Sequence, residues 1–240
     1  MVDPSPAAGV QLPKTKAGKA ERARLVLARL QAIHPDAHCE LDHANAFELV
    51  VATVLSAQTT DVAVNKATPG LFARYPDAKA MAQAEPTDLE PLLSTLGMYR
   101  QKSKNLVKLA ALLVERHGGE VPRTLAELVE LPGVGRKTAN VVLGVAFGTP
   151  EGVVVDTHVQ RLSQRLGLTK KTEPVEIEQV LMEQLPRESW DIVSHTLIFH
   201  GRRICLAIRP KCEECGVADL CPSAGARAAK VGRKPSRARG

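Results

Sequence analysis

Four cysteine side chains fall within seventeen residues near the end of the chain, with the spacing C-x6-C-x2-C-x5-C. Disulfides are disfavoured inside cells, and thiolate sulfur is a soft ligand, so this cluster predicts a metal site. The spacing and the ligand type suit either Zn²⁺ or a [4Fe–4S] cluster, although zinc ribbons more often carry two separated C-x2-C pairs. The fifth cysteine, Cys39, is expected to be a reduced thiol of the core. The four candidate ligands are Cys205, Cys212, Cys215 and Cys221.

The segment LPGVGRKTA (131–139) places a turn with two glycines between two expected helices. Gly133 and Gly135 permit positive φ and carry no side chain, so backbone N–H groups can approach a ligand closely. The second helix adds its free N–H groups and the positive end of its dipole. On a basic chain this pattern predicts a site for a DNA phosphate, although an ordinary tight helical hairpin has the same residues.

Lys137 lies in the first turn of that second helix, where the helix dipole repels a cation. This repulsion, together with partial burial, would favour the neutral amine that a nucleophile requires. Asp156 follows the apolar run Val153–Val155 and precedes the expected helix THVQRLSQRLG. A carboxylate at this position can transfer protons or stabilise positive charge, but its simplest interpretation is a helix N-cap.

Taken together, LPGVGRKTANVVL and the later VDTH resemble the signature of the helix-hairpin-helix DNA glycosylases, and the lysine is similar to that of the endonuclease III branch. The resemblance covers roughly residues 25–222. It implies a bifunctional N-glycosylase and AP lyase of base excision repair. The implied substrate is double-stranded DNA that contains damaged pyrimidines, such as thymine glycol, or abasic sites, and the implied state is a monomer.

The same resemblance assigns roles to the two candidate catalytic residues. Lys137 would attack C1′ of a flipped-out nucleotide, displace the base and form a Schiff base, after which β-elimination cuts the strand on the 3′ side. Asp156 would help to activate the lysine and would stabilise the positive charge that develops on the sugar. The cysteine spacing is similar to that of the endonuclease III cluster loop, which implies a [4Fe–4S] cluster with a structural role.

Other DNA contacts are likewise implied by the resemblance. A flipped-out base leaves a gap that side chains must fill. LSAQTTD (55–61) resembles the segment that supplies a plugging glutamine, and LGMYRQKSKN (96–105) resembles the loop that supplies a second wedge. Without the resemblance, the two residues read as a polar helix end and a core filler. The implied plugs are Gln58 and Met98, the implied backbone contacts are Gly133, Val134, Gly135, Arg136, Arg209 and Lys211, and the weaker pocket candidates are Ser56, Asp61 and His158.

The chain has a formal net charge of +6, and most of the excess lies at its ends. The last nineteen residues contain six Lys and Arg residues and no acidic residue. Such basic arms predict a polyanionic partner, of which nucleic acid is the commonest, or they serve solubility alone. Apolar stretches are too short for a membrane span, and the N-terminus lacks a signal-peptide core. We therefore expect a soluble cytoplasmic protein, associated with the nucleoid, with no membrane partner.

The elements that position these residues are expected to be helices. The apolar residues are mostly Ala, Val and Leu, and aromatic residues are few, which favours an all-α fold over a sheet. Val153–Val155 could form a strand but has no partner run. Ser103 is expected to cap the helix 103–119, and Gly118 to follow its last turn. Other expected helices are 46–58, 89–97, 124–131, 136–148, 157–167, 173–185 and 189–205.

The resemblance implies two helical domains with a DNA-binding cleft between them. A six-helix barrel would span 40–150 and include the helix-hairpin-helix at 124–148. An iron–sulfur domain would join 22–39 to 151–222. Residues 1–21 and 223–240, rich in Pro, Gly, Ala and charge, are expected to form disordered basic tails.

Three alternatives remain at this point. An adenine glycosylase of A/G mismatches would share the fold, the aspartate and the cluster, but that branch generally lacks the hairpin lysine and carries a further C-terminal domain. A non-catalytic iron–sulfur protein that binds DNA or transfers electrons would keep the fold without needing Lys137 and Asp156 together. A zinc-dependent DNA-binding module would use the same four cysteines.

Overall fold

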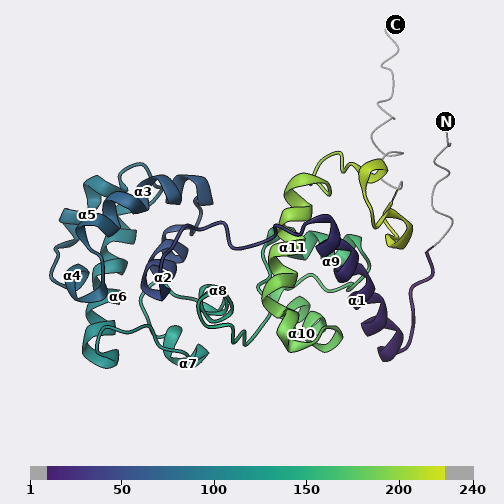
Figure 1. The fold of residues 1–240 in the computed structure, drawn as a ribbon, viewed down its shortest axis with the longest axis horizontal. Coiled ribbons are helices and arrows are strands. Elements are labelled where there is room, and N and C mark those ends of the chain that lie inside the picture. The colour runs from purple at the N-terminus through teal and green to yellow at the C-terminus, as the bar shows by residue number, and fades with distance from the viewer. Residues whose placement is uncertain (1–9, 225–240) are drawn as a thin grey trace, which may run out of the picture. The chain divides into compact units, whose positions relative to one another are not determined.

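The computed structural model describes residues 10–224, and every regular element in this range is a helix (Figure 1). The predicted all-α class is therefore confirmed. Val153 and Val154 are buried core residues and form no strand. In the part of the chain that the structure describes, no helix is both long and apolar enough to cross a bilayer. Of the tail expected over 223–240, Ser223 and Ala224 form a turn after Cys221, and the remainder lies outside the described residues.

The chain divides into two compact units, each with its own hydrophobic core. We call residues 39–151 the hairpin unit. The cysteine unit combines the chain up to residue 38 with the chain from residue 152 onward. The expected domain boundaries, 40–150 and 22–39 with 151–222, differ from this division by one residue at each crossing.

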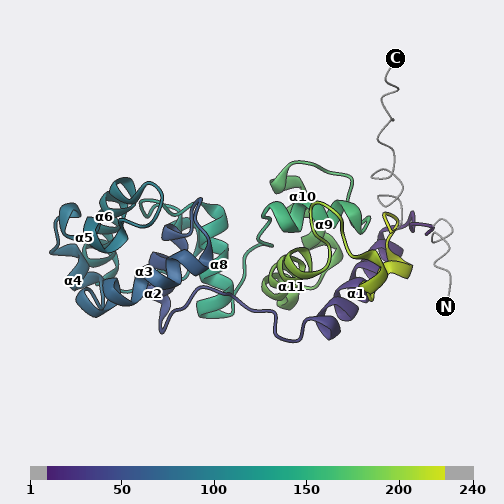
Figure 2. The same cartoon turned by 90° about the horizontal axis from the view of Figure 1, so that it is seen from above.

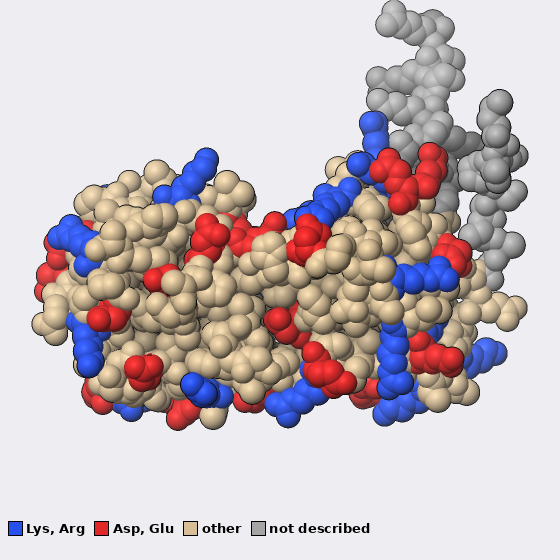
Figure 3. Space-filling view, viewed as in Figure 1, with Lys and Arg blue, Asp and Glu red and all other residues tan. Residues whose placement is uncertain are grey.

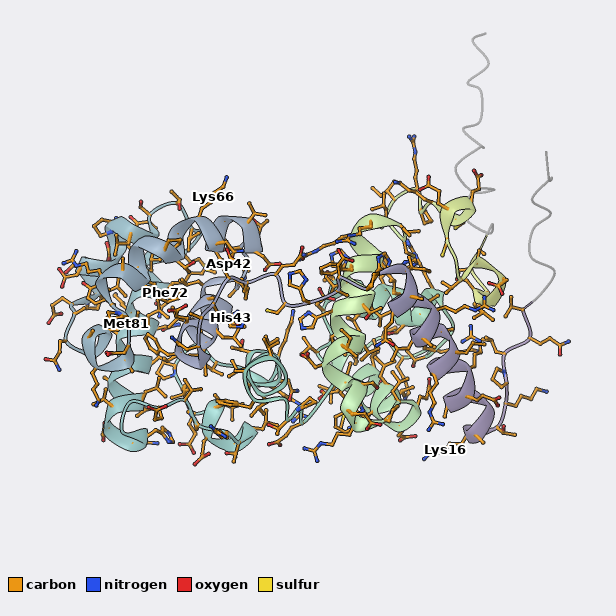
Figure 4. The ribbon with its side chains drawn as sticks, viewed as in Figure 1. Lys16, Asp42, His43, Lys66, Phe72 and Met81 are labelled. Atoms are coloured by element: carbon orange, nitrogen blue, oxygen red, sulfur yellow. The ribbon has the colours of Figure 1, made fainter. Side chains whose placement is uncertain are left out.

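The first helix, α1 (Lys16–Ile33), begins six residues before the segment 22–39 that was expected to join the iron–sulfur domain, and it ends before that segment does. Thr15 explains the early start, because its Oγ1 accepts a hydrogen bond of 3.1 Å from the N–H of Gly18 and so caps the helix. The prediction of a disordered tail up to residue 21 is therefore wrong from Lys16, which Figure 4 labels, onward. The helix packs on the rest of the cysteine unit through one stripe of buried residues spaced i, i+3, i+4 and i+7, namely Ala23, Val26, Leu27 and Leu30.

The hairpin unit contains seven helices, one more than the six expected. Two of the seven are short, since α4 has five residues and α7 has four. Almost every residue of α2 is buried, and this helix packs against α3, α6 and α8. Phe72 of α3 and Met81 of α4 point into the same core (Figure 4). The helices are α2 (Ala46–Leu55), α3 (Asp61–Arg74), α4 (Ala78–Ala82), α5 (Pro86–Leu93), α6 (Tyr99–His117), α7 (Leu125–Leu128) and α8 (Arg136–Phe147).

Two helix ends in this unit differ from the prediction, and both differences bear on candidate residues. Helix α2 ends at Leu55 instead of residue 58, so Gln58 lies in the following turn with a φ of 54°. Helix α6 begins at Tyr99, because Met98 adopts a left-handed conformation with a φ of 57° and turns the chain into the helix. The prediction that Ser103 caps this helix is wrong, since Ser103 is fully buried within it. Gly118 ends the helix in the left-handed conformation, as predicted.

The cysteine unit packs α1 against two later helices, so residues near both ends of the sequence share one core (Figure 2). Helix α9 packs on α11, and α1 packs on α10 and α11. Two short 3-10 turns follow and carry three of the four clustered cysteines at or next to their ends. The helices are α9 (Thr157–Arg165), α10 (Pro174–Gln184) and α11 (Trp190–Arg203), and the 3-10 turns are η1 (Arg187–Ser189), η2 (Cys212–Glu214) and η3 (Ala218–Leu220).

The packing of α1 predicts a large difference between two leucines on the same helix. Leu30 is fully buried, whereas Leu25 is 45% exposed. Leu30→Ala should lower the free energy of unfolding by about 2–5 kcal/mol, because it removes buried methyl groups and leaves a cavity. Leu25→Ala is the matched control and should change stability by less than about 1 kcal/mol. Urea unfolding measures both, and equal losses would contradict the assignment of α1 to the core.

Candidate functional site

The hairpin between α7 and α8 requires glycine at one of its two glycine positions. Gly133 has a φ of 85°, and a Cβ there would lie 3.1 Å from Val54 Cγ1 and 3.2 Å from Asn105 Nδ2. Gly135 has an extended conformation with a φ of −95°, so the positive φ that glycine permits is used only at Gly133. A Cβ on Gly135 would meet no atom within 4 Å, which leaves open space beside the backbone where the helix begins.

Val134 does not offer the backbone donor that was expected of it. Its side chain is 6% exposed and packs into the core, and its N–H donates to the carbonyl oxygen of Leu131 at 3.0 Å. A ligand at the hairpin would therefore be held by the neighbouring residues. The expectation of a contact from Val134 depended only on its place between the two glycines, which does not reveal this turn hydrogen bond.

The N-terminus of α8 is suited to an anion. Gly135 occupies the N-cap position without a side-chain cap, and the first turn contains no acidic residue. The first helical hydrogen bond runs from Ala139 N to Gly135 O at 2.9 Å, so the N–H groups of Lys137 and Thr138 have no partner within the helix. Arg136 and Lys137 are both exposed at this end. The helix end thus combines backbone donors, the positive end of the dipole and two cationic side chains.

The exposure of Lys137 corrects one expectation. Partial burial was expected to help keep the amine neutral, but the side chain is exposed because the core-facing residues of this turn are Ala139 and Asn140. Its position at an uncapped helix start is as predicted. The amine is therefore accessible to a substrate at the start of the helix.

Asp156 is the N-cap of α9, as the simplest interpretation of the sequence expected. Its Oδ1 accepts hydrogen bonds of 2.8 Å from the N–H groups of His158 and Val159. The residue is half-buried, and both of these bonds use the same oxygen. The cap fixes the orientation of the carboxylate while Oδ2 remains for another partner. A structural role and a chemical role are therefore compatible in this one side chain.

Two arginines tie α9 to the loop that begins with the first clustered cysteine. Arg161 Nη2 donates to the carbonyl oxygens of Gly201 at 3.0 Å and Cys205 at 3.2 Å. Arg165 donates to the carbonyl oxygens of Leu206 at 2.6 Å and Ala207 at 2.8 Å. Its Nη1 also lies 3.3 Å from the sulfur of Cys205. These partly buried contacts fasten the cysteine loop to the helix that Asp156 caps.

Neither arginine was predicted from the sequence as part of the site, although their spacing of four places them on one helix face.

His158 was a weak pocket candidate, and the structure gives it a different neighbour. Its Nδ1 lies 3.1 Å from Arg161 Nη2, and a Cβ on Gly201 would come within 2.7 Å of the same nitrogen. His158 therefore packs between α9 and α11 and orients Arg161.

The four clustered cysteines line one cavity in the cysteine unit. Its empty volume is about 300 Å³, part of which is open to solvent. All four thiols are half-buried and none is in a disulfide. No three of the described His, Cys, Asp and Glu side chains are close enough to ligate one metal ion, so the ligand set is assigned from the shared cavity and not from convergence on one point. Leu166, Ile204 and Ala218 give the cavity apolar walls.

The residues present fit an iron–sulfur cluster. Burial raises the pKa of Cys215 and Cys221, and the neighbouring thiols raise it further, so four thiolates need positive charge among them. Bound iron supplies this charge. Arg165 directs a guanidinium N–H at the sulfur of Cys205. His200, which burial and neighbouring His34 keep neutral by lowering its pKa to about 4, lies 3.5 Å from the sulfur of Cys215.

The loop between the first two cysteines presents its cations to solvent. Arg209 has a φ of 55° and is exposed, as are Ile208 and Lys211. The N–H of Lys211 donates to the carbonyl oxygen of Ile204 at 3.0 Å, which closes the loop at its base. Outside this loop, acidic and basic side chains are interspersed over the face drawn in Figure 3. The loop therefore offers two cations on a backbone that is held internally.

The two expected plugs lie in the hairpin unit, each in an exposed turn. Gln58 is exposed, and Met98 is 52% exposed, so neither interpretation as a helix end or a core filler holds. Ser56 is half-buried, and its hydroxyl donates to the carbonyl oxygen of Thr53 at 2.8 Å. Asp61 is half-buried at the start of α3. The sequence analysis missed Lys102, a buried lysine whose Nζ donates to Thr59 Oγ1 at 2.7 Å beside Gln58.

Two family models match the chain. Residues 51–187 match the HhH-GPD superfamily base excision DNA repair protein. Residues 205–221 match the iron–sulfur binding domain of endonuclease III, and this match begins and ends on the first and fourth clustered cysteines. The second match identifies the cofactor as a [4Fe–4S] cluster, and the alternative of zinc is not needed.

The curated relatives are similar over most of the chain. Endonuclease III of Synechocystis sp. is 51% identical over 88% of this chain and 96% of the relative. Endonuclease III of Escherichia coli is 41% identical over 85% and 95%.

Solved structures support the same relationship. A non-covalent endonuclease III–DNA complex matches with a TM-score of 0.82 and 44% identity, over 88% of this chain and 98% of that one. A thermostable thymine-DNA glycosylase, 20% identical with a TM-score of 0.76, shares the fold. The chain therefore belongs to the endonuclease III family of HhH-GPD base excision DNA repair proteins, and it is a DNA glycosylase and AP lyase with a [4Fe–4S] cluster.

Proposed function

We propose that this enzyme removes damaged pyrimidines, such as thymine glycol, from double-stranded DNA and then cuts the strand, with Lys137 as the nucleophile and Asp156 as its partner. The observation that carries the assignment is the position of Lys137, an exposed amine at an uncapped helix start next to an open glycine. A phosphate held at this helix end would bring the sugar of the same strand toward the amine.

In the proposed reaction, the neutral amine of Lys137 attacks C1′ of the flipped-out nucleotide. The bond from C1′ to the base breaks, and the base leaves with the electron pair and takes up a proton. Asp156 accepts the proton that the amine loses and stabilises the charge on the sugar through Oδ2. The sugar ring then opens: the C1′–O4′ bond breaks, O4′ takes the proton that Asp156 had accepted, and C1′ and the lysine nitrogen form a protonated Schiff base. Loss of a C2′ proton then expels the 3′ phosphate, and water releases the lysine.

The remaining contacts hold DNA without reading its sequence. Gly133, Gly135 and Arg136 would bind the backbone at the hairpin, and Arg209 and Lys211 would bind it at the cysteine loop. Gln58 and Met98 would fill the gap that the flipped nucleotide leaves, with Ser56 and Asp61 beside the extruded base. The cluster supplies no step of this reaction; when bound, it holds the loop of Arg209 in shape.

Lys137 belongs to the hairpin unit and Asp156 to the cysteine unit, and in the proposed reaction both act on the same nucleotide. One chain carries both groups, so a monomer is sufficient. Because the substrate is chromosomal DNA, we also propose that the enzyme acts in the cytoplasm at the nucleoid.

Lys137→Ala should abolish the covalent adduct that borohydride traps between the enzyme and a duplex containing thymine glycol. The Schiff base needs the amine, and no other side chain at the helix start supplies one. Lys108→Ala, which removes an exposed lysine from α6, is the control and should trap DNA as the wild type does. An adduct in Lys137→Ala at wild-type yield would show that another group is the nucleophile.

Asp156→Asn should slow base release about 10²–10⁴-fold while the fold stays intact. Asparagine caps a helix as well as aspartate does, but it cannot accept the proton or carry the charge. Asp156→Ala removes both functions and should cost about a further 1 kcal/mol of unfolding free energy. Single-turnover kinetics and urea unfolding separate the two effects. Full activity in Asp156→Asn would leave the residue with capping alone.

Arg165→Met should make the cluster labile, because it removes the donors to the carbonyl oxygens of Leu206 and Ala207 and to the sulfur of Cys205. The visible absorbance of the cluster should decay faster in the presence of a chelator, and the affinity for undamaged DNA should fall with it. Arg24→Met changes charge equally at an exposed site of α1 and is the control. Identical decay in both variants would remove Arg165 from the support of the loop.

A further inference from the structure

A lysine that the proposed mechanism does not use is buried in the hairpin unit. Lys102 of α6 is 4% exposed, and burial lowers the pKa of its amine. Its Nζ donates a hydrogen bond of 2.7 Å to Thr59 Oγ1. Placing an ammonium group in the interior costs free energy unless it is well paired. A buried lysine held by one hydroxyl suggests that the contact serves something other than stability.

The acceptor of this hydrogen bond belongs to the turn that carries Gln58. We call residues 56–60 the Gln58 turn. The hydroxyl of Thr59 is 3.3 Å from the carbonyl oxygen of Ala57, and the N–H of Thr59 donates to the carbonyl oxygen of Ser56 at 3.0 Å. Lys102 therefore anchors the residue that immediately follows Gln58, and through its hydroxyl also the residue that precedes it.

The backbone of the same lysine holds the second plug. We call residues 96–99 the Met98 turn. The N–H of Lys102 donates to the carbonyl oxygen of Met98 at 3.0 Å, which is the first hydrogen bond of α6. One residue thus joins the Met98 turn through its backbone and the Gln58 turn through its side chain. Both contacts lie within the hairpin unit.

Both plugs have a backbone conformation that costs energy. Gln58 has a φ of 54° and Met98 a φ of 57°, in a region that residues other than glycine enter at a cost of about 1–2 kcal/mol. Such conformations persist where the surrounding structure holds them in place. Neither side chain is itself held by packing, since both are exposed. The constraint must come from the backbone on either side, where Lys102 makes its contacts.

We propose that Lys102 is a positioning residue that couples the Gln58 turn to the Met98 turn, so that both side chains enter the duplex as one unit when the damaged nucleotide leaves the stack. This inference rests on the proposed function and deepens it. Lys102 touches neither the base nor the sugar. Its effect is confined to the step in which the nucleotide leaves the stack, and the chemistry at Lys137 is not affected.

The variants Lys102→Met and Thr59→Val remove the contact from its two ends without changing the volume greatly. Lys102→Arg retains a donor, and Lys108→Met removes an exposed lysine from the same helix as a matched control. Each variant is tested on a duplex with thymine glycol and on single-stranded DNA with a preformed abasic site. The second substrate needs no opening of a base pair, so it reports the lysine chemistry alone.

We expect base release from the duplex to fall about tenfold or more in Lys102→Met and Thr59→Val, the equivalent of one hydrogen bond to a charged group. Trapping on the single strand should stay within about twofold, and Lys102→Arg should recover part of the loss. Gln58→Ala should cost less in the Lys102→Met background than in the wild type, because coupled residues are not additive. Urea unfolding checks that the variants fold, and Thr59→Val serves if Lys102→Met does not.

Two results would overturn the inference. In the first, Lys102→Met and Thr59→Val open the damaged duplex as well as Lys108→Met does. In the second, the effects of Gln58→Ala and Lys102→Met simply add. Failure of the wild type to trap even the single-stranded abasic site would be a different result, since it rejects the proposed function and the inference that rests on it.

Discussion

The backbone N–H groups at the start of an α-helix lack partners within the helix, and the site depends on how two helices meet this requirement. Helix α9 satisfies its donors with the carboxylate of Asp156. Helix α8 begins at Gly135 with no side-chain cap and no acidic residue in its first turn. One helix start is therefore closed and orients an acid, and the other is open to an anion and carries the amine of Lys137. The same physical constraint therefore places the two groups that we propose as base and nucleophile at helix starts of opposite character.

Backbone acceptors impose the matching constraint at the cysteine loop. A loop of this length exposes carbonyl groups that no helix or sheet can satisfy. Arg161 and Arg165 of α9 supply the missing donors, and they do so from the helix that Asp156 caps. The loop that holds the cluster, the loop cations and the carboxylate thus share one rigid support. In the proposed function, this arrangement lets the cluster support the reaction by holding the loop in shape.

Features of the site that follow from residue types and their spacing were predictable from the sequence. Features that depend on tertiary packing, such as the burial of a side chain or its hydrogen-bond partner, were not. The cysteine spacing, the hairpin glycines and the position of Lys137 at a helix start follow from residue types and intervals. The helix ends at Leu55 and Tyr99 do not, because left-handed residues at Gln58 and Met98 set them and neither is glycine. The burial of Val134 and the exposure of Lys137 depend on the rotation of α8 against α2, which no local pattern records.

The residues that the sequence did not reveal are mostly buried cations. Lys102, Arg161 and Arg165 look like solvent-exposed charges in the sequence, because most lysines and arginines are exposed. In the structure each one donates to an oxygen of a turn or loop outside the regular helices. Removing a cation from water lowers the free energy of unfolding. A protein therefore keeps such a cation where the loop geometry that the cation fixes matters more than this loss of stability. Here each of these loops carries a candidate DNA contact. The cations therefore hold in place the loops that would have to be positioned accurately on DNA.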